Sequence, residues 1–329
     1  MKEVLNFLFE HKTLSKKEAY DILLNIAKGD FNNSQIASFL TVFLMRPVTI
    51  EELEGFRDAL LELCLPINLS GYDTIDLCGT GGDAKNTFNI STLSSFVVAA
   101  TGIKVAKHGN YGVSSVSGSS NVMEYMGYKF TNNESTLQRQ LDKAGICFMH
   151  APLFHPAMKT VAPIRKELGV KTFFNMLGPL VNPSRPKYQL TGVFNLELAR
   201  IYNYLLQNSD RKYVIVHSLD GYDEVSLTSD FKIVSSEMEQ IMEPAALGLQ
   251  KLKQEDLFGG DTVDSSADLF KKILNGEGTT AQNNVVAANA GMAIYCVNSK
   301  RTMTECVQSA HEALVSKKAL EVFKKLLNN

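Results

Sequence analysis

The stretch from Thr74 to Asp83 constrains the fold most strongly. The short strand pattern Thr74-Ile75-Asp76-Leu77-Cys78 runs directly into Gly79-Thr80-Gly81-Gly82. Three glycines in four residues let the backbone turn tightly, and its N–H groups can approach an anion because no side chain is in the way. The pattern is neither a P-loop nor the dinucleotide motif GxGxxG. Glycine content alone leaves an ordinary turn and a phosphate-binding loop equally open.

The residues that follow this loop predict a helix. We expect it to cover residues 91–100, with Ser91 as its N-cap. The first N–H groups of a helix have no partner within the helix and can bind a phosphate. The alternative is an ordinary capped helix without a ligand.

Strand and helix patterns alternate along the rest of the chain. Strand candidates cover residues 104–106, 188–194 and 213–217, and helical patterns such as 196–207 separate them. This alternation predicts an α/β domain with a largely parallel sheet. From about residue 264 the pattern is helical again.

The N-terminal segment, up to about residue 65, shows only helical periodicity. Residues 33–45 place their apolar side chains on one helical face, and residues 53–63 do the same. Between these stripes, Thr49 and Glu52 match a capping box at the start of the second helix. The segment therefore predicts a small helical bundle.

These patterns together predict two domains. We expect residues 1–70 to form a small all-helical domain, and residues 71–329 to form a larger α/β domain with a mainly parallel central sheet and flanking helices. Residues 156–183 are helical and fit either domain, and we assign about 160–185 to the helical one. A chain of 329 residues, 45% of them hydrophobic, is long enough to bury two such cores.

The charge balance and the cysteines restrict the class of protein. The 33 basic and 35 acidic residues give a formal charge of −2, which is no reason to expect nucleic-acid or membrane-surface binding. No apolar run reaches the ~18 residues that span a bilayer, and the N-terminus lacks a secretory signal pattern. Five cysteines without a CxxC pair predict reduced thiols. We expect a cytoplasmic protein.

A second loop rich in polar groups follows the next strand. Lys107-His108-Gly109-Asn110 leads into the hydroxyl-rich stretch Ser114–Ser119. A lysine and adaptable hydroxyl donors suit a phosphorylated ligand, whereas a serine-rich solvated loop is the alternative. Both loops follow successive strands, so we expect them at the same edge of a parallel sheet, where ligands bind in open α/β sheets.

An acidic pair, Asp223 and Glu224, follows the strand candidate of residues 213–217. Mg²⁺ often binds through one or two carboxylates together with substrate phosphates. A metal site facing the phosphate loop is therefore one interpretation. For the pair taken alone, a solvated acidic turn is the more common outcome.

Together these stretches resemble the signature of the anthranilate phosphoribosyltransferases. The matching segments occur in the order and spacing of that family and extend from end to end of the chain. They are residues 79–83, 87–92, 107–110 with Ser119, 155–165, 174–183 and 220–226.

The resemblance implies a fold, an activity and partners. The fold is that of the nucleoside phosphorylase and phosphoribosyltransferase group, and the family is typically a homodimer joined through the helical domains. The activity is transfer of the 5-phosphoribosyl group from 5-phosphoribosyl 1-diphosphate to the amine of anthranilate, in tryptophan biosynthesis. The resemblance also implies Mg²⁺, which we expect as two ions bound with the diphosphate donor.

The resemblance assigns site residues as well. Lys107, Arg165 and Asn110 would be catalytic, and Ser91, Asp223 and Glu224 would hold the metal. His108 and His155 would line the anthranilate site, although packing roles are equally open for both, and Arg165 with Asn110 and the Gly79 backbone would position anthranilate. The donor would be bound by Gly79, Gly82, Asp83, Thr87, Asn89, Ile90, Ser91, Thr92, Lys107, His108, Gly109, Asn110, Ser115 and Ser119.

Three residues depart from the family pattern, and two rival functions remain. Ala84 stands where glycine is expected, Tyr111 where arginine is usual and Asn121 where aspartate is usual, which puts the donor affinity in question. One rival is a pyrimidine nucleoside phosphorylase, because fold alone does not separate the two. That family carries a Lys-His-Ser-Thr-type loop in place of Lys107-His108-Gly109-Asn110. The other rival, a non-catalytic nucleic-acid-binding relative, requires a basic surface.

Overall fold

The computed structural model describes residues 1–112 and 117–328. The chain divides into two compact units. The first, which we call the helical unit, contains Met1–Ile67 and Ala151–Pro183. The second, the sheet unit, contains Asn68–His150 and Ser184–Asn329.

The helical unit is built from amphipathic helices around a cluster of aromatic rings. Phe56 stacks on Phe173 with 4.3 Å between ring centroids, and Phe39 and Phe43 pack edge-on against the same rings. Gly55 lets two of the helices approach closely, because a Cβ there would lie 2.8 Å from that of Ala19. Its elements are α1 (Lys2–Phe9), α2 (Lys16–Lys28), α3 (Asn33–Met45), α4 (Ile50–Leu63), α8 (Ala151–Phe154), α9 (Met158–Leu168) and the 3₁₀ turns η1 (Phe173–Met176) and η2 (Gly178–Leu180).

Two local predictions in this unit have different outcomes. The capping box before α4 is confirmed, because Glu52 N donates to Thr49 Oγ1 and Thr49 N donates to Glu52 Oε2. The prediction that residues 156–183 are helical is confirmed in part. Helix α9 ends at Leu168, since Gly169 adopts a left-handed conformation with φ of 65° and closes it, and two short 3₁₀ turns follow.

The sheet unit contains a seven-stranded sheet in the order β3-β2-β1-β4-β5-β6-β7. Strands β1 to β5 run parallel and β6 and β7 are antiparallel additions at one edge. The predicted fold class, a helical domain with a larger α/β domain and a mainly parallel sheet, is therefore confirmed. The strands are β1 (Thr74–Leu77), β2 (Lys104–Gly109), β3 (Ile146–His150), β4 (Tyr188–Gly192), β5 (Lys212–Ser218), β6 (Phe231–Ser235) and β7 (Glu239–Met242).

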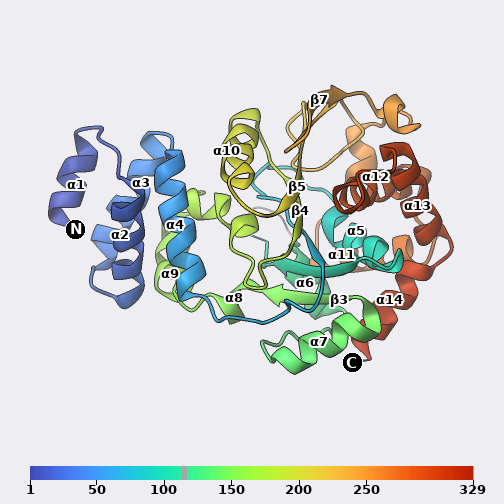
Figure 1. Cartoon of the computed structure of the whole chain (residues 1–329), viewed down its shortest axis with the longest axis horizontal. Coiled ribbons are helices and arrows are strands. Elements are labelled where there is room, and N and C mark those ends of the chain that lie inside the picture. The colour runs from blue at the N-terminus through green and yellow to red at the C-terminus, as the bar shows by residue number, and fades with distance from the viewer. Residues whose placement is uncertain (113–116, 329) are drawn as a thin grey trace. The chain divides into compact units, whose positions relative to one another are not determined.

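Helices cover this sheet and supply most of its core. Helix α12 lies beside α5 and α13 (Figure 1) and also packs on β4 and β5. The rings of Phe96, Phe270 and Phe323, which lie on three different helices, form an aromatic cluster in this core. The helices are α5 (Ile90–Ala100), α6 (Ser119–Tyr125), α7 (Glu134–Ala144), α10 (Leu196–Gln207), α11 (Val263–Leu274), α12 (Thr280–Val297), α13 (Met303–Val315) and α14 (Lys318–Leu327), with 3₁₀ turns η3 (Pro244–Leu247) and η4 (Gln254–Leu257).

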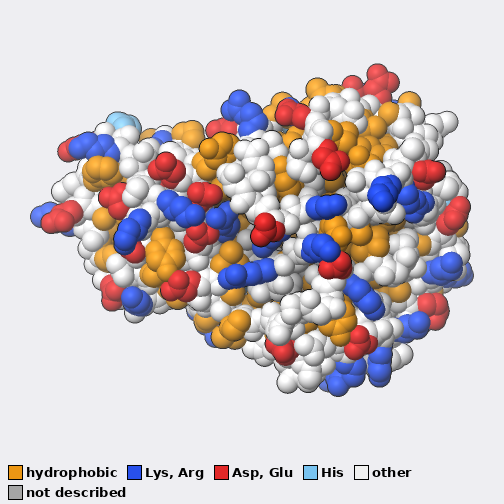
Figure 2. Space-filling view, in the orientation of Figure 1, with side chains coloured by type: hydrophobic (Ala, Val, Ile, Leu, Met, Phe, Trp, Pro, Cys, Tyr) orange, Lys and Arg blue, Asp and Glu red, His pale blue; other side chains and the backbone are white. Residues whose placement is uncertain are grey.

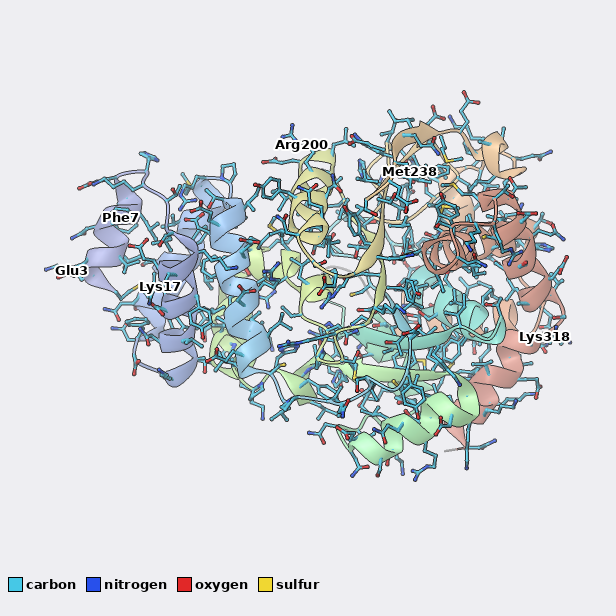
Figure 3. All side chains as sticks on the ribbon, viewed as in Figure 1. Glu3, Phe7, Lys17, Arg200, Met238 and Lys318 are labelled. Atoms are coloured by element: carbon cyan, nitrogen blue, oxygen red, sulfur yellow. The ribbon has the colours of Figure 1, made fainter. Side chains whose placement is uncertain are left out.

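The surface is mixed in character. On the face shown in Figure 2, basic and acidic side chains are interspersed with hydrophobic ones. Arg200 on α10 and Lys17 on α2 extend outward from their helices (Figure 3). Within residues 1–112 and 117–328, no helix combines the length and the apolar character needed to cross a membrane.

Candidate functional site

Three loops leave the same edge of the sheet. Residues 78–89 follow β1, the segment from Asn110 follows β2, and residues 219–230 follow β5. Strands β1, β2, β4 and β5 are mutually parallel, so their carboxyl ends meet at one edge. The prediction that the two glycine-containing loops lie at one edge is confirmed, and the acidic loop joins them there.

The first of these loops is held by hydrogen bonds at its turn. Thr80 N donates to Gly192 O at 2.9 Å, and Gly81 N donates to Asp223 Oδ2 at 2.7 Å. Gly81 and Gly82 have φ of 63° and 87°, the left-handed region that glycine adopts without strain. Ala84 also has positive φ, 58°, so an alanine here carries a strain of roughly 1–2 kcal/mol where the family expects glycine.

The acidic pair lies directly against this loop. Asp223 is buried, and its carboxylate fills the space that a Cβ on Gly79 would need, at 2.7 Å. Burial, followed by the charge of Asp83 nearby, raises the pKa of Asp223 to about 7. Burial, followed by the charge of Asp223, raises the pKa of Glu224 well above its ordinary value. The charges of Asp83 and Asp223 at the glycine turn thus add to the effect of burial in disfavouring ionisation of the acidic pair.

A buried lysine provides a positive charge at the same edge. Lys107 lies within β2, and its ammonium group donates to Leu77 O and, at 3.4 Å, to Ser91 Oγ. Its charge favours the ionised form of Glu224. The structure therefore brings together Lys107, Ser91, Asp223 and Glu224, which come from three separate segments of the sequence.

Helix α5 begins differently from the prediction. It starts at Ile90, so Asn89 is the N-cap residue and Ser91 lies inside the first turn, which makes the assignment of Ser91 as the N-cap wrong. The reason is that Asn89 already leaves the helical conformation, and its amide donates to Ser117 O at 3.0 Å. The Asn89 side chain makes no cap hydrogen bond to α5. Ile90 N donates to Phe88 O at 2.6 Å, and a backbone hydrogen bond from Ser91 favours the ionised form of Glu224, so the start of α5 faces the acidic pair.

The remaining residues of the first loop surround this helix start. Asp83 Oδ1 accepts from Lys85 N at 3.0 Å, which closes the turn beyond the glycines. Thr87 bridges to Phe258, and Thr92 is buried in the second position after Ile90. Gly82, Asp83, Thr87, Asn89, Ile90, Ser91 and Thr92, all predicted donor contacts, thus lie along one continuous segment from the glycine turn into α5.

The second loop is closed by hydrogen bonds across its two described ends. Asn121 Oδ1 accepts from Gly112 N at 2.9 Å and from Gly118 N at 3.0 Å. Ser119 Oγ donates to Asn110 O at 3.4 Å. Of the predicted site residues in this loop, Ser115 lies outside the described residues.

The residues that begin the second loop differ in exposure. Buried His108 donates its backbone N–H to Asp76 Oδ1 at 3.0 Å, whereas Asn110 is exposed. Gly109 between them is needed because a Cβ there would lie 2.5 Å from Ser119 Oγ. The loop thus leaves β2 with its backbone fixed and the Asn110 side chain at the surface.

Two predicted anthranilate residues belong to the helical unit. Arg165 on α9 is held by Asn175 Oδ1, which accepts from its Nη2 at 3.1 Å, and by the ring of Phe174 at 5.3 Å. Burial lowers the pKa of Arg165 below its ordinary value. Burial also lowers the pKa of His155 to about 4, so this imidazole is neutral near pH 7.

A cation would find oxygen ligands at the edge of the sheet unit. Within the described residues, no group of three or more His, Cys, Asp or Glu side chains forms a ready-made metal centre. The donor set is instead two adjacent carboxylates and the hydroxyl of Ser91, which suits Mg²⁺ when phosphate oxygens complete the shell. The raised pKa values of Asp223 and Glu224 fit this interpretation, because a divalent cation would relieve the repulsion between them.

Sequence reasoning missed Gly192, which lies at the end of β4. A Cβ there would lie 2.7 Å from the carbonyl carbon of Asp223, and nearer still to its oxygen. Only glycine lets the acidic loop approach β4 this closely. The signal was present, because Gly192 interrupts the strand pattern of residues 188–194, but the sequence did not show which residue lies next to it in space.

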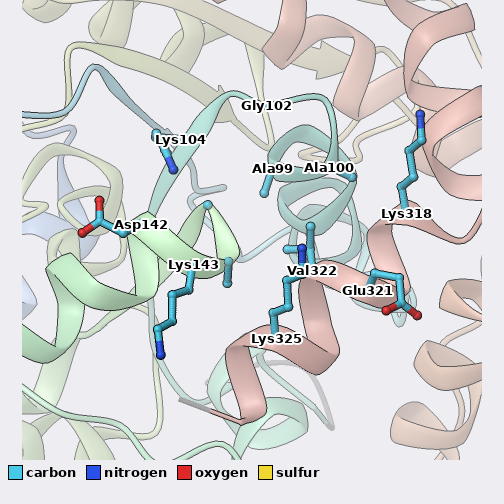
Figure 4. A pocket seen from close by; sticks show the side chains of 12 residues that line it. Ala99, Ala100, Gly102, Lys104, Asp142, Lys143, Lys318, Glu321, Val322 and Lys325 are labelled. Atoms are coloured by element: carbon cyan, nitrogen blue, oxygen red, sulfur yellow. The ribbon is translucent and has the colours of Figure 1, made fainter.

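A cavity of about 310 Å³ lies elsewhere in the sheet unit, beside the start of β2 (Figure 4). The carboxyl ends of α5 and α7 contribute to its wall, and Lys104 Nζ there donates to Leu141 O. Helix carboxyl ends carry negative partial charge, and the lysine side chains that line the cavity provide positive charge near them. The cavity is lined by Ala99, Ala100, Gly102, Lys104, Asp142, Lys143, Ala144, Gly145, Lys318, Glu321, Val322 and Lys325. It contains no predicted site residue.

Comparison with known proteins identifies relatives along the whole chain. Residues 71–320 match the family described as "Glycosyl transferase family, a/b domain", and residues 2–64 match its helical bundle domain. The anthranilate phosphoribosyltransferase of Flavobacterium psychrophilum is 64% identical over 99% of this chain and 98% of its own. That of Bacteroides thetaiotaomicron is 54% identical over the full length of both chains.

Solved structures agree with these relatives. The anthranilate phosphoribosyltransferase of Thermus thermophilus superposes with a TM-score of 0.91 at 31% identity, covering 98% of both chains. The Saccharomyces cerevisiae enzyme, in complex with PRPP and Mg, gives a TM-score of 0.87 at 27% identity, covering 96% of this chain and 93% of that one.

Proposed function

The chain belongs to the anthranilate phosphoribosyltransferase family of glycosyl transferases, and we propose that it transfers the 5-phosphoribosyl group of 5-phosphoribosyl 1-diphosphate (PRPP) to the amine of anthranilate. Diphosphate is the other product, and tryptophan biosynthesis is the pathway this reaction serves. The observation that carries the proposal is the meeting of a glycine turn, a helix start, a buried lysine and an acidic pair at one sheet edge.

The sheet unit would bind the donor. The turn from Gly79 to Asp83 and the first turn of α5 would hold the diphosphate, because glycine-rich turns and helix N-termini are favourable sites for phosphate groups. The loop from Lys107 to Asn110, with Ser115 and Ser119, would hold the ribose and its 5-phosphate. This assignment makes the sheet unit, Asn68–His150 and Ser184–Asn329, the domain that binds the donor.

We propose that the donor is bound as a magnesium complex. Asp223, Glu224 and Ser91 would hold Mg²⁺, and we propose two ions with the diphosphate. Bound Mg²⁺ would neutralise charge on the leaving diphosphate. The S. cerevisiae relative, whose structure has PRPP and Mg bound, supports the presence of the metal.

The protein's own residues would then stabilise the charges of the reaction. Breaking the anomeric C–O bond builds negative charge on diphosphate, and the ammonium group of Lys107 with the N–H groups of the first turn of α5 can bind it. An aromatic amine is neutral at pH 7 and already nucleophilic, so the chain needs no strong general base. The neutral His155 fits a lining role in place of proton transfer.

Arg165 is the residue we propose for the carboxylate of anthranilate. A guanidinium group can bind a carboxylate through two parallel hydrogen bonds and so aim the amine. Asn175 and the Phe174 ring already restrict the Arg165 side chain.

The helical unit would join two chains into a homodimer. Phe9 on α1 and Leu44 and Met45 at the end of α3 expose 59%, 45% and 84% of their surfaces. Contiguous exposed apolar surface marks protein contacts, and we propose these three side chains as part of such a surface. Sedimentation of the wild-type protein and of a Phe9→Ser/Met45→Ser variant measures the oligomeric state. A monomeric wild-type protein would reject the proposed homodimer.

The expected compartment is the cytoplasm. None of the five cysteines, all of which lie among the described residues, forms a disulfide. This state fits a reducing compartment.

The activity is tested by the loss of anthranilate fluorescence in the presence of PRPP and Mg²⁺. We expect the decrease in anthranilate fluorescence to require both PRPP and Mg²⁺. We expect no decrease in an Asp223→Asn/Glu224→Gln variant. A matched control, Glu243→Gln/Asp261→Asn, changes two exposed carboxylates of the same unit and should behave as wild type. A folded wild-type protein without turnover would reject the proposal, and phosphorolysis of nucleosides would be measured next.

A further inference from the structure

Helix α12 carries a fully buried asparagine whose partners lie outside the helix. Asn289 is 1% exposed. Its Oδ1 accepts from Val225 N at 2.9 Å, and its Nδ2 donates to Val225 O at 3.0 Å. Nδ2 also donates to Val285 O, one turn back in α12, at 2.9 Å. The amide side chain therefore pairs with both polar groups of one residue, and that residue directly follows Glu224.

The surroundings of Asn289 give no other reason for an amide. Its neighbours on α12, including Ala288, Ala290 and Met292, are buried and apolar. Asparagine is a poor helix former, and a buried amide is costly unless its hydrogen bonds are made. An apolar side chain would pack equally well at this position. The hydrogen bonds to Val225 are therefore the feature that requires an amide at position 289.

The same stretch of backbone is held from a second side. Ser218 Oγ, at the end of β5, donates to Glu224 O at 2.7 Å and accepts from Ser226 N at 3.0 Å. Gly192 leaves the space that the backbone of Asp223 occupies. The peptide groups on the carboxyl side of the acidic pair are thus fixed by buried side chains from α12 and β5.

We propose that Asn289 is a positioning residue for the acidic pair. By pinning Val225, it holds the backbone from which Asp223 and Glu224 project, so that their carboxylates stay against the phosphate loop. The inference rests on the proposed role of this pair in binding the magnesium complex of PRPP. It predicts that loosening Val225 weakens donor binding and leaves the acceptor untouched.

The test compares Asn289→Leu, which keeps the volume and removes the hydrogen bonds, with Asn289→Ala as a second variant should the first fail to fold. Asn283→Leu is the matched control on the same helix. Asn283 is also buried, but its Nδ2 donates to Gly278 O, at 3.3 Å, in the loop before α12 and not in the acidic loop. Each variant is compared with wild type by circular dichroism and thermal melting.

Two measurements distinguish positioning from general stability. Hydrogen exchange of the free protein, followed by mass spectrometry, reports on residues 219–230 without any ligand. Calorimetric titration with PRPP in the presence of Mg²⁺, without anthranilate, reports on donor binding. We expect faster exchange in this segment and a Kd raised by about tenfold or more, the usual scale for residues that orient metal ligands. In turnover, KM should rise for PRPP and stay within about twofold for anthranilate.

Each outcome bears on the inference. Unchanged exchange or an unchanged Kd in a folded Asn289 variant overturns it, as does an equal loss in Asn283→Leu. Failure of the wild-type protein to bind PRPP with Mg²⁺ overturns the proposed function and the inference together. That failure is recognised in the wild-type titration, before any variant is compared.

Discussion

Replacing Gly192 with alanine provides a sensitive test of the site geometry. The new Cβ would lie 2.7 Å from the carbonyl carbon of Asp223 and closer to its oxygen, although Cβ atoms essentially never approach other heavy atoms within 3.0 Å. Both groups are backbone, so no side-chain rotation relieves the overlap. The end of β4 or the acidic loop has to move by more than about 1 Å, because packed interiors leave little free space.

The size of this displacement sets the expected effect. A misplacement of about 1 Å at a catalytic site can lower the rate about 100-fold, which corresponds to about 2.7 kcal/mol of transition-state stabilisation. We therefore expect kcat/KM for PRPP to fall about 100-fold in Gly192→Ala. Overpacking should also lower the free energy of unfolding by about 1–3 kcal/mol.

The assay follows anthranilate fluorescence at varied PRPP and saturating anthranilate, beside thermal melting. Gly71→Ala is the control, because its Cβ would meet nothing within 4 Å and its φ is not in the left-handed region. A folded Gly192→Ala protein with kcat/KM within about twofold of wild type would refute the reasoning. The position of the Asp223 backbone would then be irrelevant to donor use.

Three further substitutions test separate parts of the molecule. Arg165→Ala should raise KM for anthranilate by about tenfold or more, since a hydrogen-bonded charge is lost, with KM for PRPP little changed in the same assay. Lys107→Met should lower kcat by roughly 100-fold or more, measured at saturating concentrations of both substrates. Glu52→Gln should lower the free energy of unfolding in urea at pH 7 by about 3 kcal/mol, because Arg46 loses its buried counter-charge. Burial raises the pKa of Glu52, but Arg46 and backbone N–H groups outweigh it and leave the pKa below 4.5. Its contribution is therefore present above pH 4.5 and lost as the pH falls below that value, so wild type and Glu52→Gln should converge in acid.

The central strands were predictable because their sequences are apolar and glycine or proline punctuates their ends. Strands β1, β4 and β5 were found within one or two residues. Strand β2 extends to Gly109, three residues beyond the predicted segment. The prediction ended early because Lys107 and His108 are polar, which is typical of a loop, although both are buried. Their burial depends on partners in other segments, Leu77 and Asp76, which local periodicity does not contain.

The missed strands have different physical causes. Strand β3 begins immediately after Gly145, the residue that closes α7, so no separate turn marks its start. Strand β7 is at the sheet edge, and three of its four residues are exposed. An edge strand needs no alternation of buried and exposed side chains, and its pairing with β6 is set by the tertiary structure.

The candidate site shows the same division between local and long-range information. The glycine turn, the lysine and the acidic pair were each recognisable from residue type and position after a strand. The contacts that join them were not, since Gly81 and Asp223 are 142 residues apart in the chain. Asn289 is a further example, because an asparagine within a helical pattern gives no indication that it binds the backbone of Val225.

The departures at Tyr111 and Asn121 preserve both the net charge of these two positions in the second loop and the closure of its backbone. Asn121 keeps the acceptor oxygen that an aspartate would supply, and that oxygen binds the N–H groups of Gly112 and Gly118. Tyr111 packs edge-on against His150 at 4.9 Å between ring centroids, where an arginine would bring a cation. An arginine and an aspartate together are neutral, and so are tyrosine and asparagine. The net charge presented to a phosphate by these two positions is therefore the same in both combinations, and the closed backbone of the loop survives the exchange.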